Sequence, residues 1–406
     1  MLEKKNPWPP ESSKERCLRG MTTIAIGWYL LLCVLHLFSL RPLWNDEECV
    51  FKSVEAFSPK DFFTKLLLAF QVFPRVYLFL IQQISKPFHF HLLMVRLPSF
   101  LCMVGAFFVW LKIASYEFKN RLHYLTFVLC WGASAVLIYY AAELKPYSMD
   151  VLVGALFILF LYRQEELEKN QTALKYSLIL TALPALVLFS YPAYVFVFLP
   201  LYNLLLPRKK AKGQLLFLMI YTGSLLTFGL FSYYFDVRLR PVEALTDGFH
   251  DYFISFASTG EFFKTLGEGT MNLLSRWFVE RPKILKQIGV FFVSLGFFRM
   301  FLGFFQNIGK DHYRVRSIHT LALVIFAELF LLGALKKYPF TVPRTSLFFC
   351  PIVLFLTVKG IDGTKNLNAF FHRLLNGAFL FYLFLVSIGI SVFVFRGELT
   401  FRPVLW

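Results

Sequence analysis

The sequence predicts an all-α fold, a polytopic bundle of helices within a membrane. Of its 406 residues 57% are hydrophobic and 51 are Phe, and the mean hydropathy is +0.59. A soluble chain of this length has no core large enough to bury so many long apolar runs. Hydrocarbon offers no hydrogen-bond partner to the backbone, so each span must pair its own amide groups, which makes the spans helices.

At 1.5 Å per residue, about eleven apolar runs are candidates to cross a bilayer. We expect residues 1–406 to form a single transmembrane domain. The candidate spans are residues 21–40, 92–114, 122–141, 147–162, 174–190, 192–206, 214–235, 287–305, 317–335, 345–358 and 374–395.

The basic residues set the expected orientation. Residues 207–212 carry four positive charges, as cytoplasmic loops do. The N-terminal tail, residues 119–121, 310–316 and 359–365 fall on the same side if every span is real, so the N-terminus is expected in the cytoplasm. This distribution explains the net charge of +17 by loop anchoring and by contacts with anionic lipid or phosphate, and no nucleic-acid partner is expected.

The opposite side then receives two long loops, residues 41–91 and 236–286. Ser58 and Asp61 form a predicted capping box, and residues 62–68 and 76–84 are predicted to be helices at the membrane surface. Residues 236–286 have a similar composition, with Gly260, Gly267 and Gly269 as predicted breaks. Little sequence follows Arg396, so no soluble C-terminal domain is expected.

The cysteines indicate neither disulfides nor a zinc site, because no C-x-x-C pair or Cys/His ligand spacing occurs. No cofactor or metal is required by any pattern here. A divalent ion that bridges acidic side chains and a phosphate stays open as an alternative. The six cysteines lie apart at positions 17, 33, 49, 102, 130 and 350.

Alternating spans bring three polar clusters to the extracytoplasmic face. They are residues 46–48 (Asp-Glu-Glu), 143–147 (Glu-Leu-Lys-Pro-Tyr) and 336–344, which includes Tyr338 and Arg344. A carboxylate is able to take a proton from a hydroxyl as it attacks, and cations stabilise charge on a departing phosphate. Asp150, one turn after Tyr147, is expected to face the bundle interior beneath this site.

Each cluster also has an ordinary explanation. An acidic group at a helix end is most often a solvated cap. Glu143 and Lys145 are spaced to form a surface ion pair, worth under about 1 kcal/mol. Arg96 and Arg344 are placed where arginines reach lipid head groups.

Four motifs resemble those of one family. Residues 43–48 (LWNDEE), the proline–aromatic stretch followed by Arg96-Leu97-Pro98-Ser99, residues 139–150 (YYAAELKPYSMD) and residues 338–351 (YPFTVPRTSLFFCP) are similar to signatures of GT-C type membrane glycosyltransferases. The protein O-mannosyltransferase group (glycosyltransferase family 39) and its bacterial relatives show the resemblance best. It covers residues 20–200 well and is patchy beyond.

This resemblance implies a polyprenyl-phosphate sugar as donor and inversion at the anomeric carbon. Asp46 matches the catalytic aspartate of the family and Glu47 the acid beside it. Lys145 stands where many relatives carry arginine, so it keeps the charge but not the bidentate fork. Arg344 matches the late arginine that contacts the donor phosphate.

We therefore expect a glycosyltransferase of the hexosyltransferase type that acts on an unidentified acceptor protein, lipid or glycan. Asp46 would be the general base, Glu47 would orient it or help to hold the acceptor, and Lys145 and Arg344 would stabilise the leaving phosphate. Glu143, Tyr147, Asp150, Tyr338 and Arg96 are further candidates. The alternative is a membrane transporter or flippase of a lipid-linked or other solute. Transporters usually place polar or broken helices near the midplane, whereas the polar clusters here gather at one surface.

Overall fold

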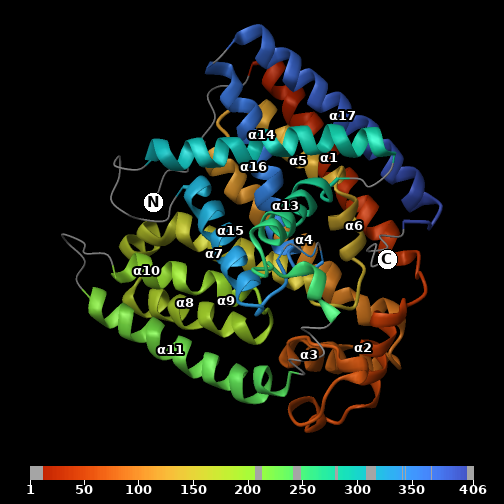
Figure 1. The fold of residues 1–406 in the computed structure, drawn as a ribbon, viewed down its shortest axis with the longest axis vertical. Coiled ribbons are helices and arrows are strands. Elements are labelled where there is room, and N and C mark those ends of the chain that lie inside the picture. The colour runs from red at the N-terminus through yellow and green to blue at the C-terminus, as the bar shows by residue number, and fades with distance from the viewer. Residues whose placement is uncertain are drawn as a thin grey trace.

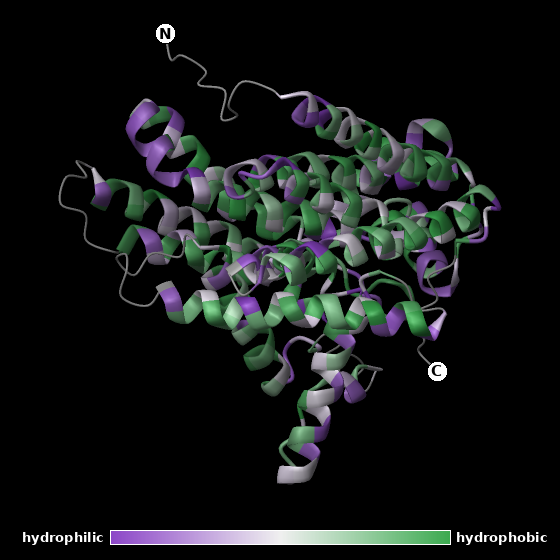
Figure 2. Cartoon of the chain, turned by 90° about the horizontal axis from the view of Figure 1, so that it is seen from above, coloured by the Kyte–Doolittle hydropathy of each residue, from purple (hydrophilic) through white to green (hydrophobic). Residues whose placement is uncertain are grey.

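The computed structural model describes residues 12–205, 213–240, 248–278, 282–307, 317–340, 342, 344–366 and 368–399. Within these ranges the chain is helical and contains no strand. The helices pack side by side in one bundle, and the short helices of the first loop lie at its lower right corner in Figure 1. Hydrophobic residues dominate most helices, and hydrophilic ones gather mainly at helix ends and in the connections (Figure 2).

In the part of the chain that the structure describes, six helices are long and apolar enough to cross a membrane. They are α1 (Ser13–Phe38), α4 (Leu92–Glu117), α7 (Tyr147–Asn170), α11 (Gln214–Phe235), α14 (Lys283–Asn307) and α17 (Ala369–Phe395). Shorter apolar helices stand at the other predicted spans: α5 (Arg121–Gly132), α6 (Ala135–Tyr140), α8 (Ala173–Ala185) with η4 (Leu186–Leu188), α9 (Ala193–Phe196), α10 (Phe198–Leu205), α15 (Ile318–Ala334) and α16 (Cys350–Gly363).

Every predicted span is therefore helical, but the count of about eleven membrane crossings is not confirmed. The short helices arise where the sequence interrupts the pattern. Ser134 separates α5 from α6, and Pro192 precedes α9. The basic segments 207–212 and 310–316, used to orient the chain, lie outside the described residues.

Helix α16 runs through the interior of the bundle and packs closely against α14. From Cys350 to Leu356 every residue is fully buried. The two helices approach so closely that a Cβ at Gly296 would lie 2.6 Å from the backbone nitrogen of Thr357, and one at Gly360 would lie 2.7 Å from the carbonyl carbon of Leu295. Small residues at such crossings allow backbones to touch, as in membrane helix pairs generally.

This contact gives a first prediction. Gly296→Ala should lower the melting temperature of the purified protein, because the added methyl pushes two backbones apart at a cost of about 1–3 kcal/mol. Gly223→Ala on α11 is the matched control. No atom lies within 4 Å of its Cβ position, so the better helix propensity of Ala should leave the protein as stable or slightly more stable. Equal melting temperatures for both variants would contradict the tight α14–α16 contact.

The first loop differs from its prediction in one segment. The capping box is confirmed, since the Ser58 N–H and hydroxyl both donate to Asp61 Oδ2, at 3.0 and 2.8 Å. The prediction of a surface helix at residues 62–68 is wrong. The chain forms only η1 (Asp61–Phe63) and η2 (Leu68–Phe70), with Ala69 and Phe70 at positive φ.

Tertiary hydrogen bonds explain this departure. The Leu68 N–H donates to Ser53 Oγ, and Arg75 Nη1 donates to the Lys65 carbonyl, so backbone groups that a helix would pair internally are used elsewhere. The second predicted helix of the loop exists as α3 (Arg75–Ser85), followed by η3 (Lys86–Phe88). A helix that was not predicted, α2 (Asn45–Ala56), begins at the acidic cluster.

The later loop contains η5 (Val237–Leu239), η6 (His250–Tyr252) and α13 (Thr259–Ser275). The three glycines predicted to break it all lie inside α13. Ser258 caps this helix by accepting a hydrogen bond from the Glu261 N–H at 3.1 Å, and the cap together with the apolar face of the helix outweighs the glycine penalty. Residues 241–247 and 279–281 of this loop are outside the described part.

Candidate active site

Asp46, Lys145 and Arg344 meet at one point. Asp46 lies in the first turn of α2, Lys145 in the link between α6 and α7, and Arg344 just before η7 (Leu347–Phe349). Oδ2 of Asp46 accepts from Arg344 Nη1 at 2.8 Å and from Lys145 Nζ at 3.3 Å. The chain thus brings together an acid and two cations that are 99 and 298 positions away from it.

The burial of these groups is unequal. The Lys145 side chain is fully buried and Arg344 is 9% exposed, whereas Asp46 keeps 29% of its side chain exposed. Burial acts to raise the pKa of Asp46, but Lys145 and Arg344 outweigh it and hold that pKa below its usual value. The same burial lowers the pKa of Lys145 to about 8, against the opposing effect of Glu143. The carboxylate is therefore the solvent-facing member of a cationic pocket.

Aromatic rings surround the Lys145 ammonium. Its Nζ lies 4.1 Å from the centre of the Trp44 ring, and 5.6 and 5.9 Å from those of Phe73 and Tyr147. Ring faces attract a cation that has lost its water. These contacts compensate part of the desolvation cost of the buried ammonium and hold it next to Asp46.

Glu143 lies behind Lys145 and is fully buried. Its Oε1 accepts from Trp44 Nε1 at 3.3 Å and stands 3.9 Å from Lys145 Nζ, and its Oε2 has no hydrogen-bond partner among the described residues. Burial raises the pKa of Glu143 above its ordinary value. The surface ion pair that would be the ordinary explanation of Glu143 and Lys145 is therefore wrong, because both groups are in the interior.

Glu47 points away from Asp46 into the protein. Its carboxylate is completely buried and accepts from Arg96 Nε and Nη2, both at 3.1 Å, and from Arg41 Nη1 at 3.0 Å. The Leu144 N–H donates to it as well, at 3.0 Å. Glu47 thus joins α2 to α4 and to the link that carries Lys145. Of its two predicted roles, a buried carboxylate with these partners fits the positioning of Asp46 and not the holding of an acceptor.

This arrangement also decides between two explanations of Arg96. Its side chain is fully buried and makes a bidentate pair with Glu47, and its Nη1 donates to the Arg41 carbonyl at 2.8 Å. An arginine that reached out to lipid head groups would be partly exposed. Arg96 is instead an internal support of the site.

Tyr147 borders the cationic pair, because its ring centre lies 5.9 Å from Lys145 Nζ. The Tyr338 hydroxyl donates to the Thr345 carbonyl at 2.6 Å, which fixes the segment next to Arg344. The Tyr147 ring packs on Phe73 at 6.1 Å. Asp150 is buried, and its Oδ1 has no hydrogen-bond partner among the described residues.

Arg41 and Trp44 were not among the predicted site residues. Arg41 adds a second positive charge beside Glu47, and Trp44 lies against both Lys145 and Arg344, with its ring centre 5.9 Å from the Arg344 guanidinium carbon. A signal for Arg41 did exist, because buried acids need cationic partners. Arg41 lies six positions before Glu47, but a single arginine after an apolar run is indistinguishable in sequence from an ordinary helix-end charge.

Metal ligands are not grouped in the described part of the chain. No three His, Cys, Asp or Glu side chains there are placed to hold a metal ion.

This helical bundle has the same fold as ArnT, a GT-C type glycosyltransferase. The solved structures of ArnT from Cupriavidus metallidurans show it. In the apo state the TM-score is 0.50 at 15% identity, over 93% of this chain and 73% of ArnT. For ArnT with bound undecaprenyl phosphate the TM-score is 0.52 at 14% identity, over 94% of this chain and 73% of ArnT. No family model matches the sequence, and no curated protein does. At this identity the likeness establishes the fold.

Proposed function

We propose that the protein is an inverting glycosyltransferase that moves a sugar from a polyprenyl-phosphate donor to a hydroxyl acceptor on the extracytoplasmic face. The observation that carries this proposal is Asp46 Oδ2 between Arg344 and Lys145, at 2.8 and 3.3 Å. One carboxylate and two cations are the groups that such a transfer needs at its two ends. The O-mannosyltransferase resemblance makes a hexose the sugar to test first.

The reaction assigns one role to each group. The acceptor oxygen attacks the anomeric carbon from the face opposite the phosphate, and its proton passes to the Asp46 carboxylate. The bond between that carbon and the phosphate oxygen breaks, and its electron pair stays on the phosphate, which gains one negative charge. Lys145 and Arg344 stabilise that charge. Attack from the opposite face inverts the anomeric configuration.

The two ion pairs of Asp46 indicate how the donor would prepare the base. Both cations are bound to the same carboxylate oxygen of Asp46. A donor phosphate that binds them competes with Asp46, which frees the carboxylate and removes the two charges that lower its pKa. Donor binding therefore makes Asp46 a stronger base at the moment when an acceptor is needed.

The comparison with ArnT supports the choice of donor. One of the two ArnT structures holds undecaprenyl phosphate, and this chain has the same fold. The aromatic residues beside the cations offer an apolar surface to a polyprenyl chain. Trp44, Phe73 and Tyr147 all lie within 6 Å of Lys145 Nζ.

The direct test uses purified protein in proteoliposomes loaded with polyprenyl-phosphate hexose and mixed short acceptors. We expect release of polyprenyl phosphate together with a glycosylated product of inverted anomeric configuration, both detected by mass spectrometry. The transporter alternative predicts that the intact sugar lipid changes leaflet and no polyprenyl phosphate forms. That result would reject the transferase.

The lowered pKa of Lys145 predicts the alkaline limit of the reaction. As pH rises through about 8, the ammonium loses its proton and its hold on the phosphate, so kcat/KM for the donor should fall above that pH. Lys145→Arg should keep the charge and move the alkaline limb upward, because guanidinium stays protonated. Lys145→Gln should be poorly active at every pH. An unmoved limb in Lys145→Arg would assign it to another group.

A further inference from the structure

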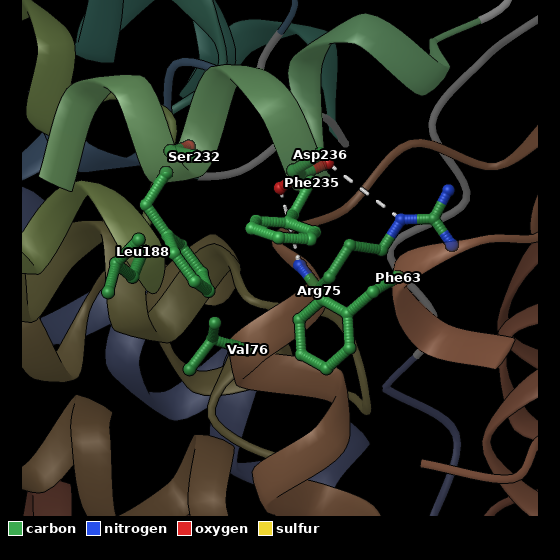
Figure 3. Close-up of a pocket in the computed structure, with 8 residues that line it drawn as sticks. Phe63, Arg75, Val76, Leu188, Ser232, Phe235 and Asp236 are labelled. Atoms are coloured by element: carbon green, nitrogen blue, oxygen red, sulfur yellow. Dashed lines mark hydrogen bonds and ion pairs between the residues drawn. The ribbon is translucent and has the colours of Figure 1, made fainter. Parts of the chain in front are cut away.

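A second cationic cluster joins the first loop to the end of α11. Arg75, the first residue of α3, is 4% exposed. Its backbone N–H donates to Asp236 Oδ2 at 3.3 Å, and its Nε lies 3.8 Å from Asp236 Oδ1, too far for a hydrogen bond. The Tyr191 hydroxyl donates a hydrogen bond to Oδ1 of the same carboxylate at 2.7 Å. Figure 3 shows the Arg75 side chain running beside the Phe235 ring, with a dashed line from its Nε to Asp236.

Arg240 adds a second positive charge to this cluster. Its guanidinium carbon lies 3.8 Å from the centre of the Tyr191 ring, and the group acts electrostatically on Asp236. The Nε atoms of Arg75 and Arg240 are both buried, and neither has a hydrogen-bond partner among the described residues. Among the described residues two guanidinium groups thus share one carboxylate, which leaves this part of the cluster one negative charge short, and buried charge without a counter-ion is costly.

An apolar pocket opens beside this charge. It is lined by Phe63, Val76, Leu188, Phe231 and Phe235 together with Arg75, Ser232 and Asp236, and its empty space, counted together with the open solvent at its mouth, is about 180 Å³. Helix α11 forms one wall and lies at the edge of the bundle in Figure 1, with Leu230 65% and Tyr233 55% exposed. A pocket with apolar walls and a cationic end, on a helix with an exposed apolar face, fits an amphiphile with an anionic head.

We propose that Arg75 and Arg240 bind the phosphate of an anionic phospholipid from the surrounding bilayer, with the first part of its acyl chain in this pocket. A phosphodiester supplies the missing negative charge and acceptors for both unpaired Nε–H groups. The bound lipid would brace α3 against α11. Phe73, two residues before Arg75, is one of the rings around Lys145, so the brace supports a wall of the candidate active site.

The test measures lipid retention by native mass spectrometry of the full chain, released from nanodiscs of phosphatidylcholine with phosphatidylglycerol. Wild type should retain phosphatidylglycerol over phosphatidylcholine, and Arg75→Gln and Arg240→Gln should each lower that retention about tenfold, the factor for losing one such contact of about 1.4 kcal/mol. Arg238→Gln is the matched control, because Arg238 is exposed, stacks on Tyr234 and is two positions from Arg240. It should retain the lipid as wild type does.

Asp236→Asn gives a change of opposite sign. Removal of the competing carboxylate leaves both guanidinium groups for the ligand, so retention of phosphatidylglycerol should rise, and this result does not depend on whether Arg75→Gln folds. Three outcomes would overturn the proposal. The first is a loss of phosphatidylglycerol retention in Arg238→Gln equal to that in the Arg75 and Arg240 variants. The second is displacement of the lipid by inorganic phosphate at a concentration similar to that of the lipid. The third is retention of polyprenyl phosphate but not of phosphatidylglycerol, which would assign the cluster to the transfer reaction.

Discussion

Asp46→Asn should abolish sugar transfer and, at the same time, tighten the binding of polyprenyl phosphate. The loss follows from removal of the general base, a contribution of about 10²–10⁴ in rate. The tighter binding follows from the ion pairs, since Asp46 Oδ2 is bound to both cations and a donor phosphate would have to displace it. An amide of the same shape no longer competes with the phosphate for Lys145 and Arg344.

The size of the gain is modest, because Asp46 is 29% exposed and its ion pairs are partly screened. A difference of about 1.4 kcal/mol would make the affinity about tenfold higher. Binding of polyprenyl phosphate to detergent-purified protein, measured by microscale thermophoresis alongside the transfer assay, would show both effects. Glu48→Gln is the control, because the adjacent Glu48 is 48% exposed and pairs with Lys52 on the surface. It should change neither quantity.

Asp46→Asn with weaker lipid binding would mean that the carboxylate helps to hold the phosphate, for instance through a bridging cation. Unchanged transfer would remove Asp46 from the chemistry. The first outcome contradicts the competition between carboxylate and phosphate, and the second contradicts the general-base role of Asp46.

Glu47→Gln should be the most destabilising single substitution in the site. It removes a fully buried charge that accepts four hydrogen bonds from Arg96, Arg41 and the Leu144 N–H. Loss of one partner of a buried ion pair costs about 3–5 kcal/mol, because the other charge stays buried and unpaired. The melting temperature in detergent should fall by many degrees, and activity should be lost even at temperatures where the variant is folded.

The comparison with Glu48→Gln isolates burial from charge, since the two acids are neighbours in one helical turn and lose the same charge. If Glu47 acts by holding α2 in place, loss of its partner Arg96 should have the same effects. Arg96→Met should then lower stability as Glu47→Gln does. It should also change kcat more than KM for the donor. Similar melting temperatures for Glu47→Gln and Glu48→Gln would show that the network around Glu47 is not a support of the site.

The convergence of Asp46, Lys145 and Arg344 could be predicted from the sequence. Apolar runs of spanning length define the alternation of the chain, and the alternation assigns three polar clusters to one face. The motif resemblance then selects one residue in each cluster. The same apolar runs predicted that the spans are helical. They did not predict how many of the helices cross the membrane, because a short apolar helix in the protein interior and one in the bilayer have the same composition.

The different roles of Asp46 and Glu47 could not be predicted, because they depend on α2. Successive residues on a helix point about 100° apart, so two adjacent acids face different surroundings only once the helix is known to begin at Asn45. In the first loop, contacts between Leu68 and Ser53 and between Arg75 and Lys65 replaced the predicted helix at 62–68. These pairs lie 15 and 10 positions apart, beyond the reach of a local pattern.

The most direct measurement is an experimental structure of the protein with bound polyprenyl phosphate. The proposed function predicts phosphate oxygens within hydrogen-bond distance of Lys145 Nζ and the Arg344 guanidinium, with the Asp46 carboxylate released from both and turned to the open side. A structure in which the lipid phosphate lies elsewhere while Asp46 keeps both ion pairs would contradict the proposed mechanism.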